Sequence, residues 1–222
     1  MHTTAYNSLS PISGTDELFF QVHYAENRLL AEIYAIFEDF LSNVKDEYQR
    51  SFAGQQANEE ERRSIDAPPP PQNVDFSPPS HHVIVGYSNE RLNPSWSKPI
   101  LEAIARYNGP EEVSLRNILY YPPGGFMGWH TNADYPGWRM YLVHVEENRK
   151  SFFRRRHPAT AEILTHWEED GCINFFKITD RHQPHWHCIA TDTHRWSAGF
   201  LVHQPFVEYI SRRSDISNRA AA

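Results

Sequence analysis

A histidine that follows a compact turn is the first residue in this sequence that could do chemistry. The stretch YYPPGGFMGWHTNAD, residues 120–134, contains two prolines and two glycines in a row, and we predict that His130 enters a strand just after this turn. An imidazole in such a position suits a metal ligand. A carboxylate would be expected two residues later, but Asn132 stands there. A metal site, a variant of one and a hydrogen-bonded loop histidine are all compatible with this stretch alone.

A second candidate ligand lies in the histidine-rich part of the chain. Five histidines fall between residues 182 and 203, and the segment PHWHC places His187 inside a predicted strand. Two histidines on neighbouring strands of a barrel can meet inside it and hold one metal ion, leaving positions open for other ligands. His185 shares a strand face with His187 and is the reserve candidate.

An arginine follows His187 after eight residues and opens the next predicted strand in the tripeptide RWS. The guanidinium of Arg195 is a planar fork that can donate two hydrogen bonds to one carboxylate. A carboxylate ligand bound near the histidines is one interpretation of this residue. A structural ion pair within the protein is the other.

From about Asn117 to Val202, the order and spacing of these residues resemble the Fe(II)/2-oxoglutarate-dependent dioxygenases, in particular the AlkB-like and prolyl-hydroxylase-like branches. The pattern of that family is His-x-Asp/Glu, then a second histidine tens of residues later, then an arginine. The resemblance implies a double-stranded β-helix core. It also implies that His130 and His187 are the proximal and distal ligands of Fe(II).

The same resemblance implies a binding site for the co-substrate. Arg195 would pair with the far carboxylate of 2-oxoglutarate, and Ser197, two residues later, would share that contact. Tyr121 occupies the position at which AlkB-like proteins have a tyrosine that touches the co-substrate. The cofactors that the resemblance implies are therefore Fe(II) and 2-oxoglutarate.

Asn132 is the departure from the family pattern. An asparagine is nearly isosteric with aspartate and can coordinate through its amide oxygen, but it is neutral, so the metal should be held less tightly. We predict that Asn132 is the third ligand or occupies the ligand position. Asp134 is the nearest carboxylate, but two residues of strand would advance it by roughly 7 Å. Asp134 and water are the alternatives for the third position.

The rest of the sequence predicts the elements that must position these residues. Apolar residues at helical spacing over residues 25–50 predict an amphipathic helix, and APPPPQ at residues 67–72 predicts an extended connector. Seven short strand-like runs follow from residue 113, separated by turn residues. Closely spaced strands of this kind are typical of an antiparallel sandwich or barrel. The predicted class is α+β, with a double-stranded β-helix (jelly-roll or cupin-like) core.

We divide the chain into three predicted segments on this basis. Residues 1–72 form an N-terminal helical segment with its proline-rich connector. Residues 73–210 form the oxygenase core, and residues 211–222 form a flexible tail.

Composition limits the partners that we expect. The formal net charge is -7, from 21 basic and 28 acidic residues, which disfavours a nucleic-acid partner because such proteins normally present a basic face. Two cysteines do not make a disulfide framework. We find no signal-peptide pattern and no apolar window of about 18 residues. We therefore expect a cytoplasmic protein with no membrane partner.

The functional prediction is an Fe(II)/2-oxoglutarate-dependent oxygenase that hydroxylates a peptide, an amino acid or a small metabolite. Two alternatives come from other classes. One is a non-catalytic jelly-roll binding protein, for which Asn132 is the main support. The other is a metal-dependent, cupin-like enzyme that does not use 2-oxoglutarate and binds its metal through several of the clustered histidines.

Overall fold

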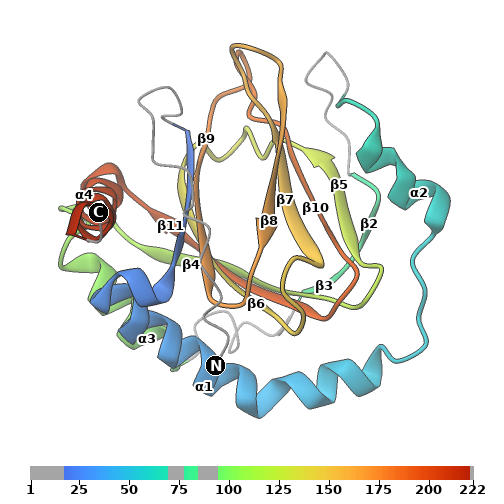
Figure 1. Ribbon diagram of the computed structural model, residues 1–222, viewed down its shortest axis with the longest axis horizontal. Coiled ribbons are helices and arrows are strands. Elements are labelled where there is room, and N and C mark those ends of the chain that lie inside the picture. The colour runs from blue at the N-terminus through green and yellow to red at the C-terminus, as the bar shows by residue number, and fades with distance from the viewer. Residues whose placement is uncertain (1–17, 70–77, 85–94, 221–222) are drawn as a thin grey trace.

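Two antiparallel β-sheets face each other in the computed structural model, which describes residues 18–69, 78–84 and 95–220 (Figure 1). The larger sheet has the strand order β1-β9-β6-β11-β4-β3, and the smaller sheet has the order β2-β5-β10-β7-β8. The strands of the larger sheet are β1 (Phe19–His23), β3 (Val83–Ile84), β4 (Ser114–Tyr121), β6 (Gly137–Val145), β9 (Cys172–Ile178) and β11 (Arg195–Val202). Those of the smaller sheet are β2 (Ser80–His81), β5 (Phe126–His130), β7 (Ser151–Arg156), β8 (Ile163–Glu168) and β10 (His187–Thr191).

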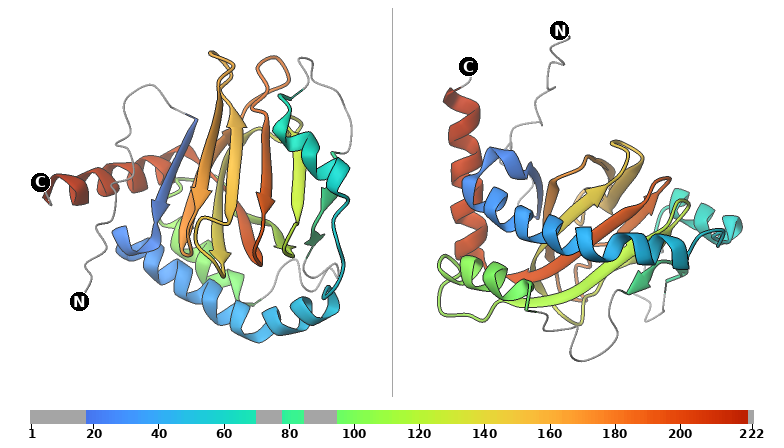
Figure 2. Two further views of the ribbon diagram at one scale, coloured as in Figure 1. Left: turned by 45° about the vertical axis from the view of Figure 1, so that its right-hand side comes forward. Right: turned by 90° about the horizontal axis from the view of Figure 1, so that it is seen from below.

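The helices lie outside this pair of sheets. Three of them, α1, α3 and α4, gather on the side of the larger sheet, and α2 lies beside β2 and β5 (Figures 1 and 2). The helices are α1 (Arg28–Ser51), α2 (Glu59–Arg63), α3 (Ser97–Ala105) and α4 (Gln204–Ala220), with short 3-10 turns η1 (Tyr24–Glu26) and η2 (Ser64–Asp66). This architecture confirms the predicted α+β class with a double-stranded β-helix core.

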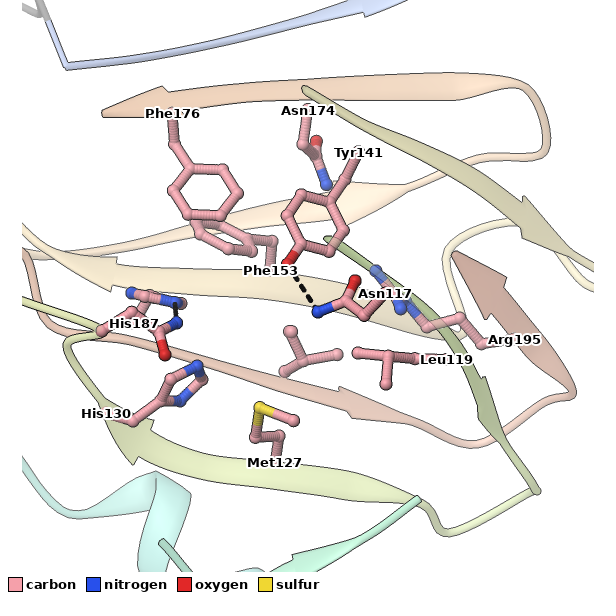
Figure 3. A pocket seen from close by; sticks show the side chains of 12 residues that line it. Asn117, Leu119, Met127, His130, Tyr141, Phe153, Asn174, Phe176, His187 and Arg195 are labelled. Carbon is pink, nitrogen blue, oxygen red and sulfur yellow. Dashed lines mark hydrogen bonds between the residues drawn. The ribbon is translucent and has the colours of Figure 1, made fainter. Parts of the chain in front are cut away.

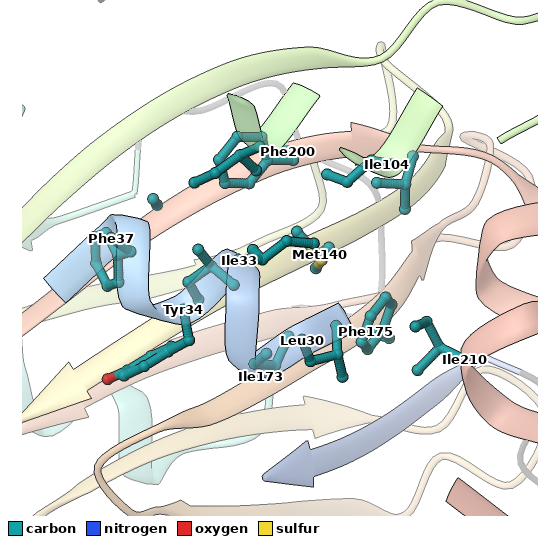
Figure 4. Packing of buried hydrophobic residues seen from close by; sticks show 14 of the residues in the cluster. Leu30, Ile33, Tyr34, Phe37, Ile104, Met140, Ile173, Phe175, Phe200 and Ile210 are labelled. Atoms are coloured by element: carbon teal, nitrogen blue, oxygen red, sulfur yellow. The ribbon is translucent and has the colours of Figure 1, made fainter. Parts of the chain in front are cut away.

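The apolar stripe of α1 holds this helix against the larger sheet. Asn27 caps the helix, since its side-chain oxygen accepts hydrogen bonds from the backbone N–H groups of the first turn. Leu30, Ile33 and Phe37 are fully buried and belong to one cluster with Phe200 of β11 (Figure 4). Burial of each such side chain stabilises the fold by about 1.5–3 kcal/mol.

Successive residues of the larger sheet supply two different cores because side chains alternate across a strand. In β9, Phe175 packs outward in the helix-covered cluster, and the next residue, Phe176, packs inward between the sheets. The inward cluster also contains Leu119, Phe153 and Ile189. The space between the two sheets is therefore lined by side chains that the outer core does not use.

Three parts of the chain add to the sequence prediction or fall outside the described residues. The N-terminal segment contributes a strand, because β1 pairs with β9 with Phe19 opposite Phe176. Helix α4 continues to Ala220, and the flexible tail at residues 211–222 stays a prediction. The predicted boundary between residues 72 and 73, and the end of the proline-rich connector, lie outside the described residues. Within those residues, no helix is long and apolar enough to cross a membrane.

Candidate active site

Two histidines from neighbouring strands meet at one end of the space between the sheets. His187, the first residue of β10, is paired in register with His130 of β5, and their ring centres are 4.1 Å apart. His130 ends its strand, whereas we predicted that it enters one. The strand begins earlier, at Phe126, because the tight turn at Gly124 and Gly125 closes just before it and the apolar run that follows already pairs with β10.

Backbone carbonyls fix the orientation of both imidazoles. The Nδ1 atom of His130 lies 2.8 Å from the carbonyl oxygen of Gly128, and Nδ1 of His187 lies 3.0 Å from that of His185. A carbonyl oxygen can only accept, so Nδ1 must carry the hydrogen in each ring and Nε2 carries a lone pair. Metal-binding histidines are commonly oriented by a partner of this kind.

The pKa values of the two rings favour the neutral form, which is the form that binds metals. Burial lowers the pKa of His130 to about 4, although its bond to the Gly128 carbonyl acts in the opposite direction. Burial and the neighbouring His130 hold the pKa of His187 well below its ordinary value. At neutral pH, two uncharged imidazoles therefore share one end of the site.

A cavity of about 90 Å³ extends from these histidines between the sheets (Figure 3). This volume suits a small ligand, since pockets for drug-sized molecules hold about 300–1,000 Å³. The apolar wall consists of Leu119, Met127, Phe153, Phe176 and Ile189. The polar residues at the end remote from the histidines are Asn117, Tyr141, Asn174 and Arg195.

Asn132 lines the cavity beside the histidines, and Asp134 does not. The amide nitrogen of Asn132 is 3.4 Å from Nε2 of His187. Its φ of 53° lies in the left-handed region, which asparagine tolerates better than most residues. The chain therefore turns after His130 instead of continuing as a strand. Asp134 is half-exposed and forms an ion pair with Arg181, whose Nε lies 2.7 Å from the carboxylate.

Arg195, predicted to bind a co-substrate, is paired with a carboxylate of the protein itself. Its Nε and Nη2 atoms donate to the two carboxylate oxygens of Glu168 over 2.7 and 2.8 Å, and Nη1 donates to Ser197 over 3.1 Å. The guanidinium carbon lies 5.0 Å from the ring centre of Tyr121. Burial acts to lower the pKa of Arg195, but Glu168 more than offsets this and raises it above the ordinary value.

Glu168 is a functional candidate that sequence reasoning missed. It ends β8, and its side chain is 0% exposed. Besides Arg195, its carboxylate accepts hydrogen bonds from Ser151 over 2.6 Å and from Asn174 over 2.9 Å. In the sequence, it stands in a run of three acidic residues before a glycine, which looks like a solvated turn. Nothing in that run distinguishes the carboxylate that turns inward.

The residues present fit a divalent metal. Two neutral Nε2 atoms face one end of the cavity, and a half-turn of the Asn132 amide would present its oxygen to the same place. Among the described residues, no group of three His, Cys, Asp or Glu side chains could hold the ion. A metal here would therefore depend on the two histidines, the neutral Asn132 and added ligands.

The described residues of this site do not offer a free cationic partner for the far carboxylate of 2-oxoglutarate. The guanidinium edge that would receive it already binds Glu168 in the two-point geometry expected for a bound carboxylate. Ser197, predicted to share the co-substrate contact, accepts from Arg195 instead. Tyr121 lies next to this ion pair, and its hydroxyl has no hydrogen-bond partner within the described part of the chain.

A row of polar residues crosses the larger sheet at the remote end of the cavity. Register places Asn174 opposite Tyr141, and Gly199 of β11 opposite both Tyr141 and Asn117. The Asn117 amide nitrogen donates to the Tyr141 hydroxyl over 3.2 Å. The Asn117 and Tyr141 side chains occupy the space beside Gly199 into which a Cβ atom would project, so only glycine fits at residue 199 without a clash.

We expect Gly199→Ala to destabilise the protein by about 1–3 kcal/mol, because overpacking a tight interior has this effect. A Cβ atom at residue 199 would lie 2.6 Å from both Asn117 Oδ1 and Tyr141 Cζ. The measurement is the urea midpoint at pH 7. Adding Tyr141→Leu to the variant should recover part of the loss, and an unchanged midpoint in Gly199→Ala would contradict the packing.

Two further residues that the sequence singled out do not line the cavity. His185 is buried but binds the Lys177 carbonyl through Nδ1 over 2.8 Å, and it does not line the cavity. Cys188 packs with Trp129 and Trp186 on the other face of the smaller sheet, where burial raises its thiol pKa to about 12. Neither residue takes part in the site as the structure shows it.

Stability should fall on mild acidification because several buried histidines resist protonation. Burial, and to a smaller extent the positive charge of Arg155, lowers the pKa of His166 to about 3. Burial lowers the pKa of His185 to about 4. Between pH 6.5 and these values the unfolded chain binds protons that the folded chain does not, so the free energy of unfolding decreases as pH falls.

We therefore expect the urea midpoint of the metal-free protein to be lower at pH 5 than at pH 7. His166→Gln keeps an acceptor for the Arg155 Nε donor, which now lies 3.1 Å from His166 Nε2. This variant should show a shallower dependence on pH. An identical slope in the variant would mean that His166 binds protons equally in the folded and unfolded chains over this pH range.

Comparisons with known proteins find similarity in structure only. No family model matches the chain, and no curated protein matches its sequence. A Pseudomonas putida prolyl-4-hydroxylase is 11% identical with a TM-score of 0.46, covering 84% of this chain and 92% of that one. A Trichoplax adhaerens prolyl hydroxylase, in complex with a hypoxia inducible factor peptide fragment, is 12% identical with a TM-score of 0.48 and 83% of each chain covered. A full-length Neurospora crassa protein in complex with alpha-KG is 10% identical with a TM-score of 0.41, covering 83% of this chain and 75% of that one. At these identities the likeness concerns the fold, and the function must be argued from the site.

Proposed function

We propose that this chain is an Fe(II)-dependent oxygenase that uses a 2-oxo acid as co-substrate. The observation that carries the proposal is the pair His130 and His187, held in register across two strands with both Nε2 lone pairs at one end of a cavity between the sheets. Bound there, Fe(II) would supply binding and reduction of O₂, with the 2-oxo acid as the source of two electrons.

The protein's own contribution is orientation and exclusion of water. The Gly128 and His185 carbonyls hold the two rings in one tautomer. Phe153 and Phe176 pack directly against His187, with ring centres 5.5 and 5.2 Å away. An apolar wall at this distance keeps bulk water from the reacting end. A peptide, an amino acid or a small metabolite remains the substrate class predicted from the sequence.

A second function is favoured by one observation. The ion pair with Glu168 neutralises Arg195, which is the residue that the resemblance assigns to 2-oxoglutarate. A metal-dependent, cupin-like enzyme without a 2-oxo acid would have no need of a free arginine. This alternative shares the metal site and differs only in the co-substrate.

One experiment separates these functions. The chain is titrated anaerobically with Fe(II), with and without a 2-oxo acid, to count the bound iron. CO₂ release is then measured from 2-oxo acids labelled at the carboxylate carbon next to the keto group. We expect one iron per chain and iron-dependent CO₂ release, both lost in His130→Gln. Iron without CO₂ release from any 2-oxo acid would support the cupin-like enzyme. No bound iron would support the non-catalytic binding protein.

A further inference from the structure

We infer that Glu168 is a built-in partner for Arg195, and that the cavity therefore accepts a 2-oxo acid with a short uncharged tail in preference to 2-oxoglutarate. This inference rests on the proposed function, because the histidine-bound metal would hold the 2-oxo acid end. It concerns the remote end of the cavity, where Arg195 and its polar neighbours lie (Figure 3).

The first step is the geometry of the ion pair. Glu168 takes two donors of Arg195 at 2.7 and 2.8 Å, and Ser197 takes a third. This is the two-point arrangement in which arginine binds a carboxylate most strongly. Both side chains are 1% exposed or less, so water does not weaken the pair. A ligand carboxylate would have to displace a carboxylate that is already part of the chain.

The second step is the charge around the cavity. Among the described residues, Arg195 is the single Lys or Arg side chain that lines the cavity, and Glu168 cancels its charge. Arg139 lies nearer to the histidine end, where it donates to the Trp138 carbonyl over 3.2 Å. The tail carboxylate of a dicarboxylate would therefore be buried without a compensating positive charge, which is unfavourable.

The third step is the hydrogen bonding available to a tail. Ser151 donates its hydroxyl hydrogen to Glu168, and Asn174 donates one of its two amide N–H groups to the same carboxylate. Asn117 Oδ1 is a buried acceptor that has no donor within the described part of the chain. An ionised carboxylate can only accept hydrogen bonds, so it would meet this oxygen without forming a bond. An uncharged tail brings no negative charge against this oxygen and avoids the penalty for burying an unpaired charge.

The reaction with such a co-substrate balances as it does for any 2-oxo acid. The bond between the carboxylate carbon and the keto carbon breaks and CO₂ leaves, while the keto carbon becomes the carboxylate of an acid one carbon shorter. One oxygen atom of O₂ enters that carboxylate and the other enters the substrate as a hydroxyl group. The 2-oxo acid and the substrate C–H bond each supply two electrons, which together reduce O₂ fully.

The test compares two ligands with the same carbon chain. 2-Oxopentanoate ends in a methyl group where 2-oxoglutarate has its second carboxylate. Binding of each to the protein loaded with Mn(II), which avoids turnover, is measured by isothermal titration calorimetry. We expect 2-oxopentanoate to bind about tenfold or more tightly in the wild-type chain, the loss expected for one unpaired buried charge. Equal or tighter binding of 2-oxoglutarate would overturn the inference.

Variants identify Glu168 as the cause. Glu168→Gln frees the charge of Arg195 and should reverse the order, with 2-oxoglutarate bound more tightly than 2-oxopentanoate. Glu169→Gln removes the same charge one residue later, at a half-buried side chain outside the cavity, and should keep the wild-type order. A Glu168→Gln chain that still prefers 2-oxopentanoate would overturn the inference.

If the Glu168→Gln variant does not fold, the comparison of the two ligands in the wild-type chain still tests the inference, because it needs no variant. If the variant is merely unstable, 2-oxoglutarate should raise its melting temperature more than 2-oxopentanoate does. If the protein binds the metal but neither 2-oxo acid, this inference is overturned, while the proposed metal site is still supported. Failure to bind Mn(II) or Fe(II) at all would overturn the proposed function, and the inference with it.

Discussion

Replacement of His187 by glutamine is expected to lower the affinity for Fe(II) by more than about a hundredfold, since loss of a residue that merely orients a ligand already costs about ten- to a hundredfold. The site has little redundancy. His130 would be left with Asn132, because the described residues contain no third His, Cys, Asp or Glu in reach. The measurement is anaerobic titration of the metal-free protein with Fe(II).

The matched control for this variant is His182→Gln. His182 belongs to the same histidine-rich stretch, but it is exposed in the turn between β9 and β10. Its replacement should leave Fe(II) affinity unchanged. The melting temperatures of both metal-free variants show whether the fold is intact. Wild-type affinity in a folded His187→Gln chain would remove this residue from the metal site.

Asn132→Asp is expected to act in the opposite direction and to tighten Fe(II) binding by about tenfold to a hundredfold, through one added negative charge beside the ion. Asparagine and aspartate have nearly the same shape, and both tolerate the left-handed backbone found at residue 132. The amide nitrogen lies 3.4 Å from His187 Nε2, so a carboxylate at residue 132 would place an oxygen beside the same imidazole nitrogen.

The same substitution should weaken the coupling between metal and co-substrate. With the neutral Asn132, an anionic 2-oxo acid contributes a larger share of the charge that holds the metal. Each should therefore increase the affinity of the other by the same factor, as linkage requires. Titrations of Fe(II) with and without 2-oxopentanoate, in both proteins, measure this factor.

Equal Fe(II) affinity in the wild-type and Asn132→Asp chains would mean that this side chain is outside the coordination sphere. Water would then be the better candidate for the third position. Asp134 offers little as a replacement, because it is ion-paired with Arg181 at the surface. The comparison of Fe(II) affinities therefore shows whether Asn132 or water occupies the third ligand position of the metal.

The sequence by itself determined the features that depend on neighbours along the chain. Apolar periodicity predicts α1, and short apolar runs between turn residues predict the strands of the core, because helix and strand periods are local properties. Strand alternation also predicts that the two sheets have a separate inner face. The order of His130, His187 and Arg195 was sufficient to propose one site, although not to place its third ligand.

Only the tertiary structure decided how that site is neutralised. Glu168 ends β8 at the edge of the smaller sheet, whereas Arg195 begins β11 in the middle of the larger one. The pair forms because the two sheets face each other, and no pattern along the chain records that contact. The same holds for β1, which joins the larger sheet beside β9 from far away in the sequence. Pairing across sheets depends on which inward side chains meet in a closed space, and a buried charge must find its partner there.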